Sequence, residues 1–316
     1  MDSSYTKIMP SLNLLKGLNP SPFTYTGTNI YLLGSPSSVI MIDAGQDVPA
    51  YQSLLSSIIS EHKLKIEHII ITHFHPDHTF GLKFLIQHNP AVKIYKFLTD
   101  DPEASPLTID LNSLDLSFES FLRLNKMQIS ESLKIQTFDT LLQNQLGFLY
   151  KPLKNSDILN LNDYSLEIFH LPGHSNDSIG IYEKNTKCFF SGDTILGLGS
   201  GTTINNVSLY MKSLEKIMRL DIVNLLPGHG DVYLGTYKAK EQIDLFYSHR
   251  KKREVQIEEC LENGEKMSLG EIFGRVYGEV GSELVEAAKR NLKMHLEKLV
   301  EEGKVGIVGQ EIYAKL

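Results

Sequence analysis

Short apolar runs alternate with amphipathic stretches through the N-terminal third of the chain. The β-rich runs at 29–33, 39–42 and 66–72 predict strands. Apolar residues at helical spacing predict helices over 48–62 and about 79–87. Strands that alternate with helices in this way predict a layered α/β core with helices on the faces of the sheets.

The strand pattern returns after Leu159, whereas residues 100–158 lack sustained alternation apart from a helix-like piece around Phe118, Phe121 and Leu122. That segment is therefore predicted to be an insertion in the core. The later elements are read from apolar runs and helical spacing in the same way. The predicted strands cover 164–171, 179–182, 188–190 and 222–226, and the predicted helix covers 207–220.

The C-terminal part has a different pattern, with three helices followed by two short strands. A charged helix is expected over 237–261, and Ser268 and Glu271 form a capping box that opens a second. A third is expected over 282–303, and strands at 305–308 and 311–314 would flank a turn at Gly309-Gln310. This order of elements is typical of a small winged-helix domain.

Composition narrows the class of protein. The chain has 316 residues, of which 41% are hydrophobic and 22% charged, which excludes a disordered chain. No apolar run approaches the roughly 18 residues of a membrane-spanning helix, so no membrane association is expected. Two cysteines are too few for a disulfide framework, which favours a reducing, intracellular compartment.

The 11 histidines are the unusual part of the composition, and several of them follow predicted strands. His73 and His75 lie two residues apart just past a buried strand, so both imidazoles point the same way. Asp77 and His78 follow at once. Three further candidates each follow a glycine after a later strand: His174, Asp193 and His229.

Together these seven side chains are five imidazoles and two carboxylates, enough for two metal ions that share one carboxylate. Nitrogen and oxygen ligands without sulfur favour Zn²⁺, with Mn²⁺ or Fe as weaker options. A pair of such ions suits hydrolysis, since metal ions generate hydroxide near neutral pH and hold a developing oxyanion. The alternative, that each histidine is a surface or core residue, explains single positions but not the joint pattern.

These motifs resemble those of the metallo-β-lactamase-fold hydrolases, which implies an αββα sandwich with two metals at one edge of the sheets. By that resemblance His73, His75 and His174 would hold the first Zn²⁺. Asp77, His78 and His229 would hold the second, and Asp193 would bridge the two ions. The expected domains are an N-terminal extension over 1–20, the hydrolase domain over 21–236 with an insertion at about 100–158, and a winged-helix-like domain over 237–316.

A narrower resemblance is to the lactamase-beta-like protein 2 subgroup, carried by the segments 27–33, 191–196, 201–203, 210–214 and 249–254. Better-known animal members of that subgroup are mitochondrial endoribonucleases acting on single-stranded RNA. The resemblance therefore implies cleavage of single-stranded RNA by metal-activated hydroxide, which Asp77 would orient. It also implies the mitochondrial matrix, or the cytoplasm if the N-terminus is not a presequence. It covers about 19–99 and 159–316 and fails between them.

Weaker candidates surround this site. Asn29, Tyr210, His249 and Arg250 are candidate substrate contacts, with strand-end hydrogen bonding, helix packing and a solvated basic face as the respective alternatives. Asp43 ends a strand and would orient a ligand histidine from behind, or form a turn.

Two other functions remain open: a thioesterase or lactonase like glyoxalase II on the same metals, and a non-enzymatic winged-helix binding protein. Residues 241–316 hold 12 Lys and Arg against 15 Asp and Glu, so autonomous binding of duplex DNA is not expected.

Overall fold

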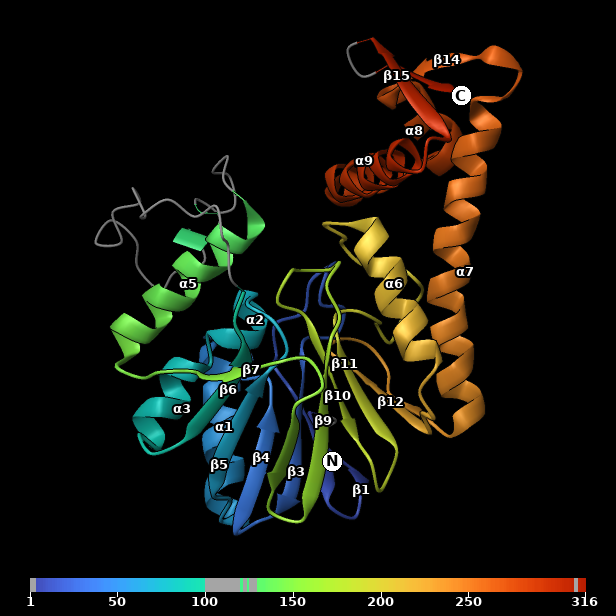
Figure 1. Ribbon diagram of the computed structural model, residues 1–316. Coiled ribbons are helices and arrows are strands. Elements are labelled where there is room, and N and C mark those ends of the chain that lie inside the picture. The colour runs from blue at the N-terminus through green and yellow to red at the C-terminus, as the bar shows by residue number, and fades with distance from the viewer. Residues whose placement is uncertain (1–3, 100–119, 122–123, 125–129, 310–311) are drawn as a thin grey trace.

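The computed structural model describes residues 4–99, 120–121, 124, 130–309 and 312–316. Two β-sheets face each other in its larger part (Figure 1). The first sheet has seven strands in sequential order, antiparallel from β1 to β4 and parallel from β4 to β7. Its strands are β1 (Tyr5–Met9), β2 (Leu12–Lys16), β3 (Asn29–Ser35), β4 (Ser38–Ile42), β5 (Ile66–Ile71), β6 (Lys93–Phe97) and β7 (Lys151–Leu153).

The second sheet has six strands in the order β13-β12-β11-β10-β9-β8, with β11 and β12 parallel and the other pairs antiparallel. The strands are β8 (Ile158–Leu161), β9 (Tyr164–His170), β10 (Ile179–Glu183), β11 (Cys188–Gly192), β12 (Asn224–Pro227) and β13 (Tyr233–Leu234).

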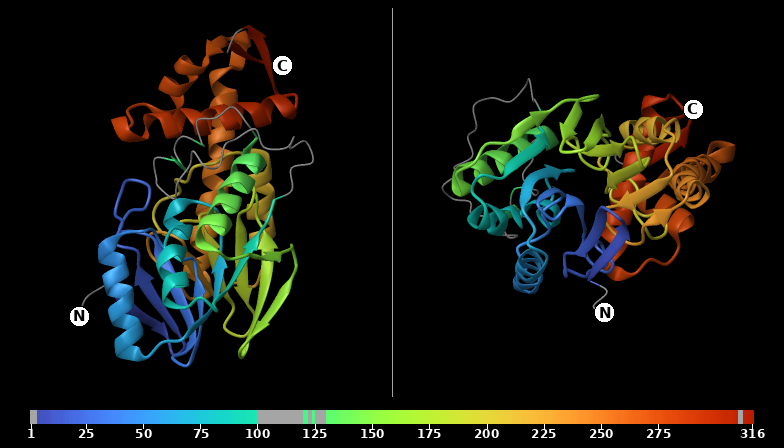
Figure 2. Two further views of the ribbon diagram at one scale, coloured as in Figure 1. Left: turned by 90° about the vertical axis from the view of Figure 1, so that its left-hand side faces the viewer. Right: turned by 90° about the horizontal axis from the view of Figure 1, so that it is seen from below.

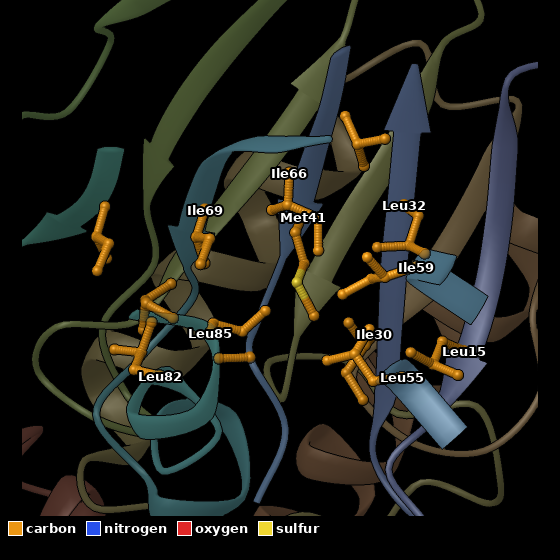
Figure 3. Packing of buried hydrophobic residues seen from close by; sticks show 14 of the residues in the cluster. Leu15, Ile30, Leu32, Met41, Leu55, Ile59, Ile66, Ile69, Leu82 and Leu85 are labelled. Atoms are coloured by element: carbon orange, nitrogen blue, oxygen red, sulfur yellow. The ribbon is translucent and has the colours of Figure 1, made fainter. Parts of the chain in front are cut away.

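Helices cover the outer faces of both sheets. The first sheet is covered by α1 (Pro49–His62) and α3 (Leu82–His88), and the second by α6 (Val207–Met218) and α7 (Thr236–Cys260). Figure 3 shows Leu55 and Leu82 from these helices among the strand residues Met41 and Ile69. A second apolar layer joins the sheets, where Tyr31 meets Phe190 edge to face. The αββα sandwich predicted from the resemblance is confirmed.

The C-terminal part has its own apolar core around Ile272, Leu296 and Tyr313. The capping box of Ser268 and Glu271 is present, and the predicted winged-helix domain is confirmed. Its elements stand beyond one end of the sheets, above α6 in Figure 1 and at the top of the left-hand view of Figure 2. They are η2 (Glu262–Gly264), β14 (Lys266–Ser268), α8 (Leu269–Tyr277), η3 (Ser282–Leu284), α9 (Val285–Glu301), β15 (Val305–Gly309) and β16 (Ile312–Lys315).

Several local predictions need correction. Residues 1–20 are predicted as an N-terminal extension, yet they contain β1 and β2, which extend the first sheet and bury Leu12 and Leu15 in its core. The helix predicted over about 79–87 is present as α3, and a separate short helix, α2 (Pro76–Thr79), precedes it across a break. Gly81 lies at that break, where a Cβ would come within 2.0 Å of the Ala44 carbonyl oxygen.

The segment predicted as an insertion contains the long helix α5 (Glu131–Leu146), capped by the Ser130 hydroxyl. The apolar face of α5 packs on Phe74 and Phe80 beside α2, so the segment joins the larger domain. Most of the predicted helix-like piece, with Phe118 and Leu122, and the turn at Gly309-Gln310 lie outside or partly outside the described residues. The domain boundaries stay predictions. Within the described residues, no helix is long and apolar enough to cross a membrane.

Candidate metal centre

Five strands end at one edge of the two sheets, and a polar side chain follows each. The pairings make β4 parallel to β5, and β9 parallel to β11 and β12, so their carboxyl ends open together. A hydrogen bond from the Ile179 amide to the Thr72 carbonyl joins the two sheets at this edge. The strands and their polar side chains are β4 with Asp43, β5 with His73, β9 with His174, β11 with Asp193, and β12 with His229.

Two glycines let these ends approach closely. A Cβ on Gly228 would lie 2.4 Å from Oδ1 of Asp193. Gly173 has φ +137°, and its Cβ would lie 2.5 Å from the Cα of Tyr210. The Pro-Gly-His sequences at His174 and His229 therefore place each imidazole where a larger residue would block the turn.

The first group of side chains is His73, His75, His174 and Asp193. Nε2 of His73 lies 2.9 Å from Nδ1 of His75, and Nε2 of His174 lies 3.2 and 3.1 Å from those two nitrogens. The second group is Asp77, His78 and His229, in which Oδ2 of Asp77 lies 3.2 and 3.1 Å from the two Nε2 atoms.

Asp193 stands between the groups. Its Oδ2 lies 3.7 Å from Nε2 of His174 on one side and 3.2 Å from Nε2 of His229 on the other. All seven sequence-predicted ligands are thus brought together, and the ligand atoms within each group lie within 4.8 Å of one another.

This donor set fits metal ions better than it fits hydrogen bonds. Each neutral imidazole has one donor and one acceptor nitrogen, so three nitrogens that converge on one point cannot satisfy one another. Buried Oδ1 of Asp193 also has no hydrogen-bond partner among the described residues. Imidazole nitrogen and carboxylate oxygen are ligands that Zn²⁺ accepts.

The two groups differ in charge. Burial lowers the pKa of His75 to about 3 and holds that of His73 well below its ordinary value, which leaves neutral imidazoles with free lone pairs. Burial opposes the charge of His229 as well, but Asp193 and Asp77 outweigh it and raise its pKa to about 9. A proton on His229 therefore balances the negative charge of Asp77 and Asp193.

Hydrogen bonds from outside orient the ligand atoms. Oδ2 of Asp43 lies 2.7 Å from Nδ1 of His78, and the same carboxylate accepts from the amide and hydroxyl of Thr72. Nδ1 of His174 lies 2.8 Å from the Thr203 carbonyl oxygen, and the Thr28 hydroxyl donates to Oδ2 of Asp77 at 3.1 Å. Asp43 thus contacts a ligand imidazole, which is one of the two roles that the sequence left open for it. Thr28 and Thr203 also position ligand side chains, namely Asp77 and His174. The sequence did not select either threonine for this role.

The candidate substrate contacts divide into two pairs. Asn29 is fully buried and donates to the carbonyls of Pro227 and Gly230, so it fixes the turn of His229. Tyr210 is also fully buried, with its hydroxyl bonded to the Thr194 carbonyl. Neither lines the cavity at this site, so both are positioned for packing rather than for substrate contact. His249 and Arg250 do line that cavity.

The cavity has a volume of about 790 Å³ and lies between the ligand cluster and the C-terminal domain. His75, Asp77, His174, Asp193 and His229 form one side. Other walls are largely apolar and come from the loop before β3 and from the region of α8 and α9. Those wall residues include Phe23, Tyr25, Tyr277, Val280, Leu284, Ala287 and Ala288.

A buried ion network supports the loop of His174. Nζ of Lys96 lies 2.8 Å from Oδ2 of Asp139 on α5 and 2.6 Å from Oδ2 of Asp177. The Ser175 hydroxyl donates to the other oxygen of Asp177 at 2.7 Å. The sequence showed no sign of this network because its members lie far apart in the chain.

Asn291 on α9 connects the C-terminal domain to the same loop system. Its Nδ2 donates to the Thr202 carbonyl at 2.9 Å, and its Oδ1 accepts from the Ile204 amide at 3.0 Å. These bonds hold the residues on both sides of Thr203, whose carbonyl orients His174. No motif singled out Asn291, since only the folded chain brings it near this loop.

Comparison with known proteins agrees with the geometry. The family described as "Metallo-beta-lactamase superfamily" matches residues 24–103 and 152–229, and "Beta-lactamase associated winged helix domain" matches 268–311. A crystal structure of a beta-lactamase domain protein from Burkholderia ambifaria has a similar fold. Its TM-score is 0.74 at 18% identity, over 100% of this chain and 96% of that one.

Two curated relatives are similar over most of their length. The Beta-lactamase-like protein 2 homolog of Drosophila melanogaster is 31% identical over 96% of this chain and 92% of its own. The Atrochrysone carboxyl ACP thioesterase of Aspergillus fumigatus is 26% identical over 89% of this chain and 74% of its own. The sequence match, the αββα sandwich and the His/Asp cluster lead to one conclusion: the chain belongs to the metallo-β-lactamase superfamily.

Proposed function

We propose that this chain is a metal-dependent endoribonuclease that cleaves single-stranded RNA. The observation that carries the proposal is the cavity, in which His249 and the guanidinium-bearing Arg250 face the same space as the His/Asp cluster. A phosphodiester strand needs both a cationic surface for its phosphates and a group that polarises the scissile phosphate. The subgroup resemblance supports the same assignment, and the fly relative bears the name of that subgroup.

We propose two Zn²⁺ ions, the first held by His73, His75 and His174 and the second by Asp77, His78 and His229, with Asp193 shared. When bound, such ions lower the pKa of water and neutralise charge that develops on the substrate. Asp77 would orient the attacking water, since its Oδ2 already accepts from Thr28 and faces the cavity. In the reaction, the water oxygen bonds to phosphorus as the bond from phosphorus to the leaving oxygen breaks.

A second candidate is a thioesterase or lactonase on the same residues. The apolar walls of the cavity favour it, because they would accept an acyl chain, and one relative is named as an acyl-carrier-protein thioesterase. The positive charge beside those walls favours RNA instead, because an acyl group carries no negative charge that would pair with a guanidinium group.

One experiment decides between these candidates. Zn²⁺-loaded protein is incubated with single-stranded RNA, duplex RNA and a glutathione thioester, each beside the Asp193→Ala variant. The proposal predicts cleavage of single-stranded RNA, little of the duplex, and loss of cleavage in the variant. Thioester hydrolysis without RNA cleavage would contradict it and select the second candidate.

The location proposed for the protein is the mitochondrial matrix, which rests on the subgroup resemblance alone. Fluorescence of the full chain with a C-terminal tag tests it: the signal is expected to coincide with a matrix marker. A diffuse cytoplasmic signal would contradict this location.

A further inference from the structure

We propose that Arg250, Arg253, His249 and His295 form a binding site for a phosphate group at the junction of the two domains. This inference rests on the proposed function in one respect, since it takes the phosphate to belong to the RNA strand. The site is separate from the His/Asp cluster, although both line the same cavity. Three of its members lie on α7 and one on α9.

The first argument is charge without a counter-charge. Among the described residues, no carboxylate lies within 4.0 Å of the guanidinium of Arg250 or Arg253, although Arg250 is only 2% exposed. The nearby buried carboxylate of Glu254 is already paired with Lys251 at 3.5 Å and Lys298 at 3.0 Å. The guanidinium of Arg250 lies over the rings of Tyr210 and Phe246, at 5.5 and 5.7 Å from their centroids. These rings attract the cation but carry no net charge, so the buried positive charge points to an anion from outside the chain.

The second argument is a surplus of donors. Arg250 donates to the Ser200 carbonyl at 2.8 Å and to Nδ1 of His249. Arg253 donates to the Val276 carbonyl at 2.7 Å and to Oε1 of Gln256 at 3.2 Å. Nε of both arginines still has no partner in the described part of the chain. An oxyanion with several lone pairs accepts such hydrogen bonds at once.

The two histidines strengthen this imbalance. Nδ1 of His249 faces Arg250, and its Nε2 lies 3.5 Å from a guanidinium nitrogen of Arg253. A neutral imidazole has a single acceptor nitrogen, so it cannot accept from both. His295 is 2% exposed and lines the cavity, and its Nδ1 has no partner among the described residues.

The surroundings favour a nucleotide phosphate over a small carboxylate. The guanidinium of Arg253 lies 3.9 Å from the ring centroid of Tyr277, and both residues line the cavity. Beside them, Val280, Leu284 and Ala288 give an apolar wall. Single-stranded nucleic acid is bound by this combination, in which cations contact phosphates while bases lie on aromatic and apolar surfaces.

The test compares matched charge removals on one helix. Arg253→Gln removes a charge from the site, and Lys252→Gln removes one from the exposed neighbouring position of α7. Binding of a short fluorescent phosphorothioate oligoribonucleotide to Zn²⁺-loaded protein is measured by anisotropy at several salt concentrations. Arg253→Gln is expected to weaken binding about tenfold and to lower the salt slope by about 0.7, as for one lost phosphate contact in a single strand. Lys252→Gln is expected to change binding less than twofold.

Two further variants keep the result interpretable. Arg253→Lys retains the charge and is expected to recover part of the lost affinity, while His295→Gln is expected to weaken binding without changing the fold. Thermal unfolding checks each variant. Equal binding by Arg253→Gln and Lys252→Gln would overturn the site, whatever the activity of the protein.

The source of the phosphate is tested separately from the site. If the wild type cleaves no RNA but hydrolyses thioesters, kinetics with a coenzyme A thioester and a glutathione thioester replace the binding assay. A rise of KM in Arg253→Gln for the phosphate-bearing thioester alone would keep the phosphate site and reject the endoribonuclease. A KM unchanged for both thioesters would reject the site as well.

Discussion

The cavity is bordered by two groups of histidines that sit in opposite electrostatic surroundings. At the metal centre, Asp77 and Asp193 raise the pKa of His229 to about 9 against the effect of burial. At the domain junction, burial and then Arg250 and Arg253 lower the pKa of His249 to about 4. The imidazole of His229 is therefore a charged partner of carboxylates, whereas the imidazole of His249 is a neutral neighbour of cations.

This difference shows that the neighbours of a buried histidine decide its ligand. Carboxylates beside imidazoles make a site for cations. Burial makes the negative charge of a carboxylate unfavourable, and a bound cation neutralises that charge. Guanidinium groups beside imidazoles make a site for anions for the converse reason. Substitutions that exchange or remove these neighbours test the contrast directly.

Asp193→Asn is expected to have the largest effect. It removes the one negative charge that lies between the two ligand groups, so kcat/KM on the proposed substrate should fall by about 10³-fold or more. Steady-state kinetics with Zn²⁺-loaded protein measure the loss. Asp231→Asn changes an exposed carboxylate two residues beyond His229 and should leave kcat/KM within twofold. Equal activity of the two variants would contradict the role of Asp193.

Asp43→Asn tests the hydrogen bond that orients His78, a candidate metal ligand. Asp43 holds Nδ1 of His78 at 2.7 Å, and loss of such a partner weakens metal binding about 10–100-fold. Competition with a chromophoric chelator measures the affinity. The matched variant Asp47→Asn changes a carboxylate that pairs with Lys83 instead, and its affinity should not change. Unaltered Zn²⁺ affinity in Asp43→Asn would show that the carboxylate only forms the turn.

Asn291→Ala connects the two groups, because α9 carries Asn291 as well as His295. Loss of its two hydrogen bonds to Thr202 and Ile204 should lower the free energy of unfolding by about 1–3 kcal/mol. Zn²⁺ affinity should fall only a few-fold, since the Thr203 carbonyl loses support but not its place. Denaturant unfolding and chelator competition measure the two effects. A loss of stability without any loss of Zn²⁺ affinity would show that α9 does not influence the metal centre.

The smallest expected effect concerns pH at the domain junction. The pKa of His249 is lowered from 6.5 to about 4 by burial, Arg250, Arg253 and Lys252, and His295 of α9 lies within electrostatic range. The unfolded chain therefore takes up a proton near pH 6.5 that the folded chain refuses until about pH 4. Stability should fall as pH drops through that window.

His249→Gln removes this contribution. The difference in the free energy of unfolding between variant and wild type should change between pH 7 and pH 4.5. Because His249 is partly exposed, that change should stay near 1 kcal/mol. Urea unfolding at both pH values measures it. A difference that does not depend on pH would contradict the lowered pKa, and bound phosphate should reduce the effect by favouring the protonated imidazole.

The sequence pattern predicts those parts of the site in which a functional side chain comes directly after a strand. His73, Asp193 and His229 were visible because parallel strands bring their carboxyl ends to one edge, so local sequence already implied proximity. Residues 5–16 were missed because they are short runs at the edge of the sheet. The helix α5 was missed because its apolar positions are interrupted by polar residues such as Gln136 and Asp139.

Contacts across the fold were beyond such reasoning. The sequence places Asn29 and Tyr210 near the predicted site. In the structure both side chains point into the interior, where they donate hydrogen bonds to backbone carbonyls. His295 had no motif around it, and Arg253 was visible only within the segment 249–254, which carries the subgroup resemblance. Their significance depends on which groups face them from other elements, and residue order does not contain that information.

The shared cavity has a consequence for how such proteins diversify. The reacting groups belong to the sandwich, while much of the opposite wall, from Tyr277 to Ala288, belongs to the winged-helix part. Exchange of that part between relatives would thus alter the molecules that are accepted while the reaction itself is preserved. The winged-helix part would thus vary one wall of the cavity, while the loop before β3 and the reacting groups stay with the sandwich. The bonds from Asn291, Arg290 and Glu301 of α9 to the sandwich form the joint at which a chimaera has to match.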